Sequence, residues 1–418
     1  MSNEFNEFLL NLQVDNIDEI ITSLDNIAKK LNQKYYNNSS NDNYLIVGSM
    51  GRKTSIKGES DIDVIYELPN EVYDRFENYD SNGQSQLLNE IRDELKEQYP
   101  LTDIKGDGQV VVISFKKYQI ELVPGFKQLD NSYKFPDTHD GGSWKTTKPI
   151  QEINETNNMI NTTATYRDLC QMIREWKANN GVSICGLLID TLVKKFLDEN
   201  ITYKWFSKSK YYDLITNVFK YLSEQNEEQK QWNALGSNQI IVNKNFNFVK
   251  KSKETYGELL NADDKSSKLR ELFGNRFPIS EKAAKEYGFS NTEQFIEELY
   301  PIYITYNLKI DCEITQSGFR PAMLSEFLRN HYMIKHNRKL KFIITNCNVL
   351  KPYDIYWKVR NVGSEAIRRK CIRGQIVKGT EKLNETANFF GPHYVECFIV
   401  KNSVCVARDR INVNIDYN

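Results

Sequence analysis

The chain has 418 residues, of which 40% are hydrophobic and 27% are charged, and its formal net charge is −1. This length predicts two or three domains. The balanced charge excludes a protein that coats nucleic acid with its whole surface, so any polyanion must be bound by a local cluster. No stretch approaches the roughly 20 apolar residues of a membrane span and the N-terminus is acidic, so we expect a cytoplasmic protein without membrane contact.

Seven cysteines are scattered along the chain, and none of them forms a C-x-x-C pair. An odd number at loose spacing argues against a disulfide framework and against a zinc site. We expect reduced and mostly buried thiols, and we assign no metal role to any of the four histidines.

The first 160 residues alternate between helical and extended patterns. Apolar residues at helical spacing predict one or two helices over 4–37. A short apolar run at 44–48 ends in glycine, and 61–66 alternates as a strand does. Further along, the pattern predicts a polar helix over 84–99, a hairpin formed by 110–115 and 118–123, and an ordered loop over 135–149.

The pattern of apolar residues changes twice further along the chain. From about 160 to 300, apolar residues recur every three or four positions, which predicts helices. After about 303, short extended runs between turn signals predict a β-sandwich. The expected helices cover 166–179, 184–198, 211–222, 261–272 and 291–298. The expected strands cover 303–314, 340–346, 354–361, 370–377, 393–400 and 404–413, with one helix at 322–331.

Two aspartates lie close together on the strand predicted at 61–66. Side chains at i and i+2 of a strand point the same way, so Asp61 and Asp63 share one face while Ile62 and Val64 face the core. Two carboxylates held so close repel each other unless a cation lies between them. Magnesium binds one or two carboxylates together with substrate phosphates, and a pair of such ions can activate a hydroxyl and stabilise a leaving pyrophosphate.

A third carboxylate comes from the predicted hairpin. Glu121 lies between Ile120 and Leu122 and so points away from their apolar face. An acid in such a strand is costly without a partner, and a metal ion is a sufficient one. We therefore predict that Asp61, Asp63 and Glu121 form the catalytic site and hold two magnesium ions, for which manganese can substitute.

The loop before the aspartates has the composition of a phosphate-binding turn. Gly48 would let the backbone approach a phosphate closely, and the Ser49 hydroxyl and nearby amides could hold a triphosphate. Arg52 lies within reach of the same charge. A lone D-x-D pair is usually a solvated strand face, and G-S alone is a weaker signal. The agreement of G-S, a polar loop, D-I-D and an isolated acid on a later strand favours catalysis.

This arrangement resembles the DNA polymerase β nucleotidyltransferase superfamily and, within it, the bacterial cGAS/DncV-like enzymes known as CD-NTases or SMODS enzymes. Further segments that carry the resemblance are 122–126, 133–137, 142–144 and 174–177. The resemblance implies that Lys177 meets the triphosphate and that Tyr211 or Tyr212 contacts a base. A solvated lysine and a packed tyrosine are the ordinary alternatives. Asp190 departs from the family pattern, which has glutamate there.

The last third of the chain resembles the AGS-C sensor domain that is found fused to SMODS enzymes. The segments that carry this resemblance are 357–363, 373–375 and 390–397. Within and around them, Trp357, Arg360, Arg373 and Tyr394 suit ligand recognition and suit a packed core with charged edges equally well. Tyr417 stands near the chain end and is a candidate primer, because a nucleotidyltransferase of the Hailong defence system, which makes DNA oligomers, looks similar in this respect.

Together these features predict an α+β protein with a polymerase β-like palm at 1–160, a helical half at 161–301 and an Ig-like β-sandwich at 302–418. The resemblance implies template-independent joining of nucleoside triphosphates, with ATP or dATP favoured. The product would be a short signalling oligonucleotide, cyclic or linear, that activates a separate effector in anti-phage defence. Two alternatives are a transferase that modifies a protein or a small molecule and a non-catalytic nucleotide sensor.

Overall fold

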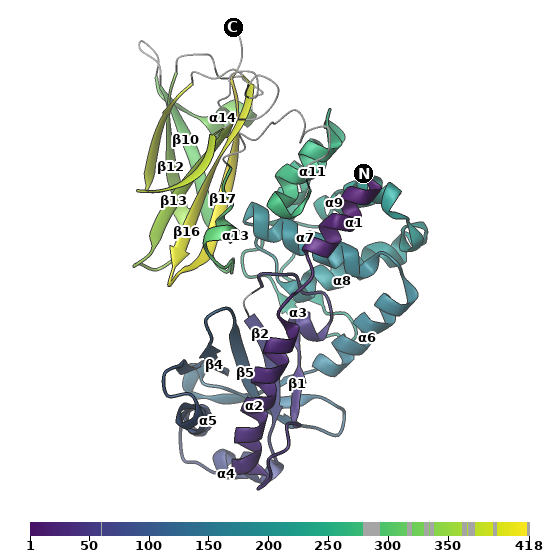
Figure 1. The fold of residues 1–418 in the computed structure, drawn as a ribbon, viewed down its shortest axis with the longest axis vertical. Coiled ribbons are helices and arrows are strands. Elements are labelled where there is room, and N and C mark those ends of the chain that lie inside the picture. The colour runs from purple at the N-terminus through teal and green to yellow at the C-terminus, as the bar shows by residue number, and fades with distance from the viewer. Residues whose placement is uncertain are drawn as a thin grey trace.

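The computed structural model describes residues 1–59, 61–278, 293–315, 320–329, 334, 338–361, 366, 373–387 and 391–415. Figure 1 shows a mixed sheet flanked by helices, a helical region next to it, and a β-rich region that contains the last strands. This arrangement confirms the α+β class. Among the described residues, no helix combines the length and apolar character that crossing a membrane requires.

The first sheet has seven strands and carries the predicted carboxylates. Its order is β1-β2-β5-β4-β3, with β6 joined to β5 and β7 joined to β6. Only β2 (Asp61–Glu67) and β5 (Gln119–Lys127) run parallel, at the centre of the sheet. β1 (Tyr44–Ile46) and β3 (Asp103–Asp107) lie at the two ends of this order, and β4 (Val110–Ser114) lies between β5 and β3. The helices α2 (Ile17–Tyr35), α4 (Asn70–Glu77) and α5 (Gly83–Gln98) bury their apolar faces against it.

The loop predicted over 135–149 is wrong, because this stretch forms β6 (Tyr133–Asp137) and β7 (Ser143–Thr147). Its proline and glycines hide the alternation of a strand. The pairing is decided by β5, whose last two residues meet the start of β6. Trp144 then packs its ring on Phe126 of β5 and on Tyr73 of α4.

A helical region follows, and its core is separate from that of the first sheet. The long helices are α6 (Pro149–Thr162), α7 (Tyr166–Asn180), α8 (Gly186–Glu199), α9 (Tyr211–Ser223), α10 (Phe248–Leu260) and α11 (Lys265–Phe273). The sequence did not predict α10, because its lysines mask an apolar face that includes Phe248 and Leu259. The first helix, α1 (Ser2–Asn11), packs here through Phe5 and Phe8 and not on the sheet.

The β-rich region consists of two four-stranded antiparallel sheets that contribute side chains to one core. One sheet contains β11 (Ala322–Met323), β10 (Leu308–Thr315), β12 (Lys339–Cys347) and β15 (Lys382–Thr386). The other contains β14 (Arg373–Gly379), β13 (Asp354–Asn361), β16 (Gly391–Lys401) and β17 (Val404–Ile415). The two-layer β architecture agrees with the sequence, and the Ig-like assignment stays a prediction.

Element boundaries in this part of the chain differ from the predicted ones. The strand expected over 303–314 begins at Leu308, because the residues before it pair with β17 instead. Of the helix expected over 322–331, β11 takes the first two residues, and α14 covers Leu324–Arg329 within the described residues. The helix expected over 291–298 is reduced to α13 (Ile296–Leu299) within the described residues.

Candidate functional site

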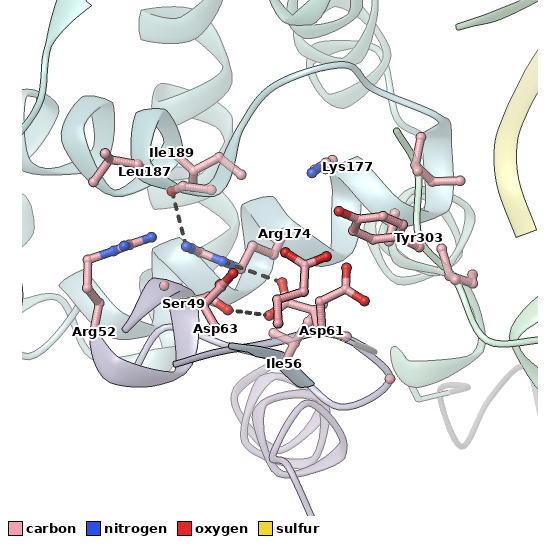
Figure 2. A pocket seen from close by; sticks show the side chains of 18 of the residues that line it. Ser49, Arg52, Ile56, Asp61, Asp63, Arg174, Lys177, Leu187, Ile189 and Tyr303 are labelled. Carbon is pink, nitrogen blue, oxygen red and sulfur yellow. Dashed lines mark hydrogen bonds and ion pairs between the residues drawn. The ribbon is translucent and has the colours of Figure 1, made fainter. Parts of the chain in front are cut away.

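A cavity of about 520 Å³ lies where the first sheet, the helical region and the segment leading into the β-rich region meet. Its walls come from β2, β5, the short helix α3 (Gly48–Gly51), α7, α8 and residues 300–304. Figure 2 shows that side chains from all these directions point toward a common space. The cavity is therefore built from parts of the chain that lie far apart in sequence.

The three predicted carboxylates share one wall of this cavity. On β2, Ile62 and Val64 are buried in the core below, which leaves Asp61 and Asp63 on the opposite face. The parallel register of β2 and β5 places Glu121 directly beside Asp63. The alternation inferred from the sequence thus brings the three acids together.

Burial and the mutual repulsion of the carboxylates raise the pKa values of two acids on this wall. Burial, followed by the charge of Asp61, raises the pKa of Asp63 to about 6. Burial, followed by the charges of Asp61 and Asp63, raises the pKa of Glu121 to about 7. Acids in this state gain from a cation, because the cation removes both the desolvation penalty and the mutual repulsion.

The wall supplies oxygen ligands, which suit a hard cation such as magnesium. Within the part of the chain that the structure describes, no three acidic, histidine or cysteine side chains already converge as a metal site. Magnesium does not require such a cage, because it usually takes one or two carboxylates and completes its shell with water and substrate phosphates. The carboxylate wall fits this mode of binding.

Position 48 must be a glycine, because the Asp63 carboxylate leaves no room for a side chain there. Its φ is +61°, in the region that favours glycine, and a Cβ there would lie 1.9 Å from the Oδ2 atom of Asp63. The turn can therefore pass directly over the acid only because position 48 has no side chain. This gives the glycine a role that the sequence did not show.

Ser49 lines the cavity but already has an intramolecular partner. Its hydroxyl donates to the Oε2 atom of Glu59 at 2.8 Å, and the other oxygen of Glu59 lies 3.6 Å from the Arg174 guanidinium. The sequence did not single out Glu59. Its place two residues before Asp61 was the available signal, because it continues the i, i+2 spacing of the aspartates.

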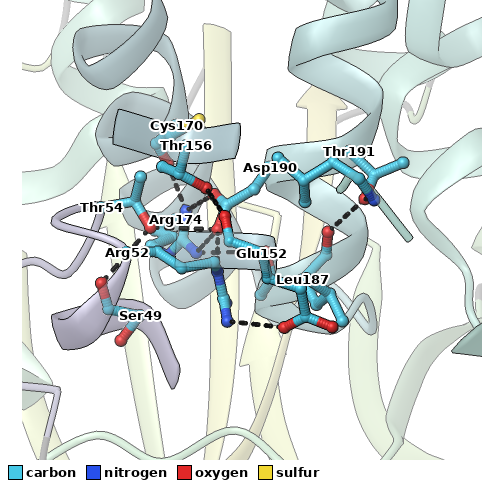
Figure 3. A network of polar contacts seen from close by, with 12 residues as sticks. Ser49, Arg52, Thr54, Glu152, Thr156, Cys170, Arg174, Leu187, Asp190 and Thr191 are labelled. Atoms are coloured by element: carbon cyan, nitrogen blue, oxygen red, sulfur yellow. Dashed lines mark hydrogen bonds and ion pairs between the residues drawn. The ribbon is translucent and has the colours of Figure 1, made fainter. Parts of the chain in front are cut away.

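Arg52 belongs to a buried network beside the cavity (Figure 3). Its Nε atom donates to Asp190 at 2.8 Å, and Nη1 lies 3.8 Å from Glu152. Arg174 contacts the same aspartate at 2.7 Å, and Thr54 donates to it at 3.1 Å. Burial alone would raise the pKa of Asp190, but the two arginines more than offset it, and the pKa lies below its usual value.

Family models identify both ends of the chain. Residues 1–159 match the Second Messenger Oligonucleotide or Dinucleotide Synthetase (SMODS) domain, and residues 290–416 match the Adenylyl/Guanylyl and SMODS C-terminal sensor (AGS-C) domain. The chain therefore carries the catalytic domain of the SMODS enzymes, or CD-NTases, followed by the AGS-C domain. It is therefore a nucleotidyltransferase, as predicted. No curated protein matches its sequence.

Solved structures of other CD-NTases are similar to part of this one. CdnC from E. coli MS115-1 with ATP shares 15% identity at a TM-score of 0.47, covering 66% of this chain and 99% of its own. The Vibrio cholerae cyclic AMP-GMP synthase DncV shares 16% at 0.45, covering 56% and 69%. CdnG from Bradyrhizobium diazoefficiens with GTP shares 9% at 0.48, covering 66% and 95%. All three TM-scores lie below 0.5, and the family assignment rests on the two domain matches.

Two further predicted residues of this CD-NTase have different surroundings. Lys177 lies on α7 and lines the cavity, where burial lowers its pKa. Tyr211 is 1% exposed in the helical core and does not line this cavity, which favours the packed-tyrosine alternative over contact with a base. Its hydroxyl donates to Asp168 at 2.6 Å. The apolar face of α9 buries this ring, whereas the sequence alone could not tell which face that was.

The aromatic residues highlighted in the AGS-C region are packed. Trp357 is buried in the shared core, and its indole N–H donates to the Thr380 carbonyl at 2.8 Å. Tyr394 is also buried, with its hydroxyl donating to Glu293 at 2.9 Å. These contacts favour the packed-core alternative for both. Tyr417 lies outside the described residues.

Proposed function

We propose that this CD-NTase joins nucleoside triphosphates without a template into a short signalling oligonucleotide. A hydroxyl attacks the α-phosphate, and pyrophosphate leaves. The observation that supports this best is the wall formed by Asp61, Asp63 and Glu121, on adjacent parallel strands and facing a cavity large enough for nucleotides. The match to a domain of oligonucleotide and dinucleotide synthetases supports the same reaction.

In this proposal Asp61 and Asp63 hold two magnesium ions, or manganese in their place, and Glu121 completes the site. Bound there, the metal supplies positive charge for the phosphates and for the attacking oxygen. The raised pKa values of Asp63 and Glu121 give these side chains a reason to bind a cation.

The remaining cavity residues hold the triphosphate. Ser49 offers a hydroxyl at the turn that Gly48 makes possible, and Lys177 supplies a cation from the opposite wall. Arg52 acts less directly, since its ion pairs with Asp190 and Glu152 anchor the Ser49 turn to the helical region. Electrostatic positioning of this kind is the main contribution that a protein makes to phosphoryl transfer.

The product is proposed to be cyclic, or linear and primed by Tyr417, and to be made from ATP or dATP. It would act on a separate effector in bacterial anti-phage defence. The AGS-C match supports a signalling role, since this domain is described as a sensor appended to SMODS enzymes.

The test is incubation of the purified protein with labelled ribonucleotides and deoxyribonucleotides plus magnesium, followed by mass spectrometry of the products. An oligonucleotide that disappears in the Asp61→Ala variant supports the proposal. A nucleotide attached to another protein or to a small molecule would support the modifying transferase instead. Nucleotide binding without any product would support the sensor.

A further inference from the structure

Residues 301–304, which we call the strap, line the cavity and lie within the AGS-C match, shortly before strand β10. Their backbone pairs with β17: the Tyr303 N–H donates to the Cys405 carbonyl, and the Cys405 N–H donates to the Pro301 carbonyl, both at 2.8 Å. Ile302 packs its side chain in a small cluster that includes Phe398 and Cys405. The strap is thus fastened to the last strand of the AGS-C region.

The other edge of the strap pairs with Glu59 of residues 52–59, which we call the catalytic loop. Ile302 forms a parallel β-bridge with Glu59 and a second one with Cys405. Glu59 is the acid that accepts the Ser49 hydroxyl and lies near Arg174. Ile302 therefore links β17 to Glu59, and Glu59 accepts the hydrogen bond of the Ser49 hydroxyl that is proposed to bind phosphate.

Tyr303 reaches the carboxylates themselves. It lines the cavity together with Asp61 and Glu121, and burial, followed by the charges of these two acids, raises the pKa of its hydroxyl above the usual value. Figure 2 shows the Tyr303 ring on the Asp61 side of the carboxylates, among the side chains that line the cavity. The side chain is still 40% exposed, so it can leave the cavity without opening an apolar core.

We propose that the strap is an autoinhibitory contact through which the AGS-C region controls the catalytic site. It holds Tyr303 against Asp61 and Glu59 against Ser49, so a divalent cation and a triphosphate compete with the protein's own side chains. Withdrawal of the strap frees both at once, because Ile302 pairs with Glu59 and Tyr303 follows it in the chain. This proposal rests on the proposed function of the same carboxylates.

The first experiment uses Mn²⁺ alone as the probe and measures free Mn²⁺ by electron paramagnetic resonance. Tyr303→Phe keeps the ring and removes the hydroxyl that shares the cavity with Asp61, so we expect Mn²⁺ to bind about tenfold more tightly than to the wild type. Tyr79→Phe is the matched control, since Tyr79 is 43% exposed and does not line the cavity. Unchanged or weaker Mn²⁺ binding in Tyr303→Phe, or none in either protein, overturns the proposal.

The second experiment follows hydrogen exchange of the Tyr303 and Cys405 amides, whose bonds fasten the strap. Exchange should quicken when Mn²⁺ and nucleoside triphosphates are added to the full chain. Slower exchange would mean that the strap closes over its ligand, which overturns the proposal. A nucleotide label that stays on the wild-type protein and is lost in Tyr303→Phe would also overturn it, because Tyr303 would then be an acceptor.

These readouts separate the two proposals. If Tyr303→Phe binds Mn²⁺ more tightly but no variant makes an oligonucleotide, the proposed function fails and the strap proposal stands. If the wild type makes an oligonucleotide while Mn²⁺ binding and the initial rate of pyrophosphate release are the same in Tyr303→Phe, the strap proposal fails and the function stands. Under the strap proposal, pyrophosphate release is faster in Tyr303→Phe.

Discussion

Two groups of acids, one partly buried and one buried, lie side by side in this protein and behave in opposite ways. On the cavity wall, the pKa values of Asp63 and Glu121 are raised, because burial and neighbouring carboxylates both disfavour the charged form. In the adjacent network, Arg52 and Arg174 hold the pKa of Asp190 below its usual value despite complete burial. The compensated acid stabilises the fold, whereas the uncompensated pair is suited to a ligand that the protein itself does not supply.

The largest expected effect is on activity when the wall loses a charge. We expect Asp63→Asn to reduce oligonucleotide synthesis roughly 1000-fold, because a charge that positions metal and substrate is gone. Its melting temperature should not fall, since the variant removes a repelled buried charge. Rates and thermal melts of the same preparation check both statements. A large loss of stability would show that the Asp63 carboxylate stabilises the fold, as the Asp190 carboxylate does.

The compensated acid should give the opposite result. Asp190→Asn leaves Arg52 and Arg174 buried without their shared carboxylate, and we expect a loss of about 3 kcal/mol in the free energy of unfolding. Denaturant titration measures it. Asp198→Asn is the control on the same helix, because its ion pair with Lys194 is 41% exposed on the aspartate side and should contribute less than about 1 kcal/mol.

Gly48→Ala tests whether the wall and its turn depend on each other. The new Cβ would meet the Asp63 carboxylate at a φ that already disfavours alanine, so we expect a loss of about 1–3 kcal/mol and roughly 100-fold lower activity. Gly141→Ala separates strain from collision, since that glycine also has a positive φ but no atom within 4 Å of the added Cβ. Full activity in Gly48→Ala would contradict the assigned role.

The smallest expected effect is on the pH dependence of stability. Because the folded-state pKa values of Asp63 and Glu121 are raised, the folded protein binds protons more tightly than the unfolded chain. Stability from these groups is present at about pH 4 and is lost as the pH rises to about 7. Magnesium binds the deprotonated acids, so it should raise the melting temperature by a few degrees at about pH 8 and by less at about pH 5. Equal shifts at both pH values would argue against a cation on this wall.

Local patterns were sufficient for several parts of this protein. Alternation along 61–66 predicts that Asp61 and Asp63 share a face, and the isolated acid in the next hairpin predicts Glu121 as their partner. Helical spacing predicts most of α7, α8 and α9. Such inferences hold because neighbours two or four positions apart have fixed geometry within a strand or helix. Tyr211 shows the limit, since helical spacing does not say whether a face meets the core or a ligand.

The sequence by itself identified the three carboxylates and the glycine–serine turn that line the candidate site, and the order of the SMODS and AGS-C domains. Only the tertiary structure decided which charged groups are compensated, because Asp190, Arg52 and Arg174 meet across distances in sequence that no periodicity spans. It also decided that Tyr303 and Glu59 lie in the cavity. Their placement depends on how β17, the strap and the catalytic loop pair, and such nonlocal pairing leaves no repeating pattern in the residues themselves.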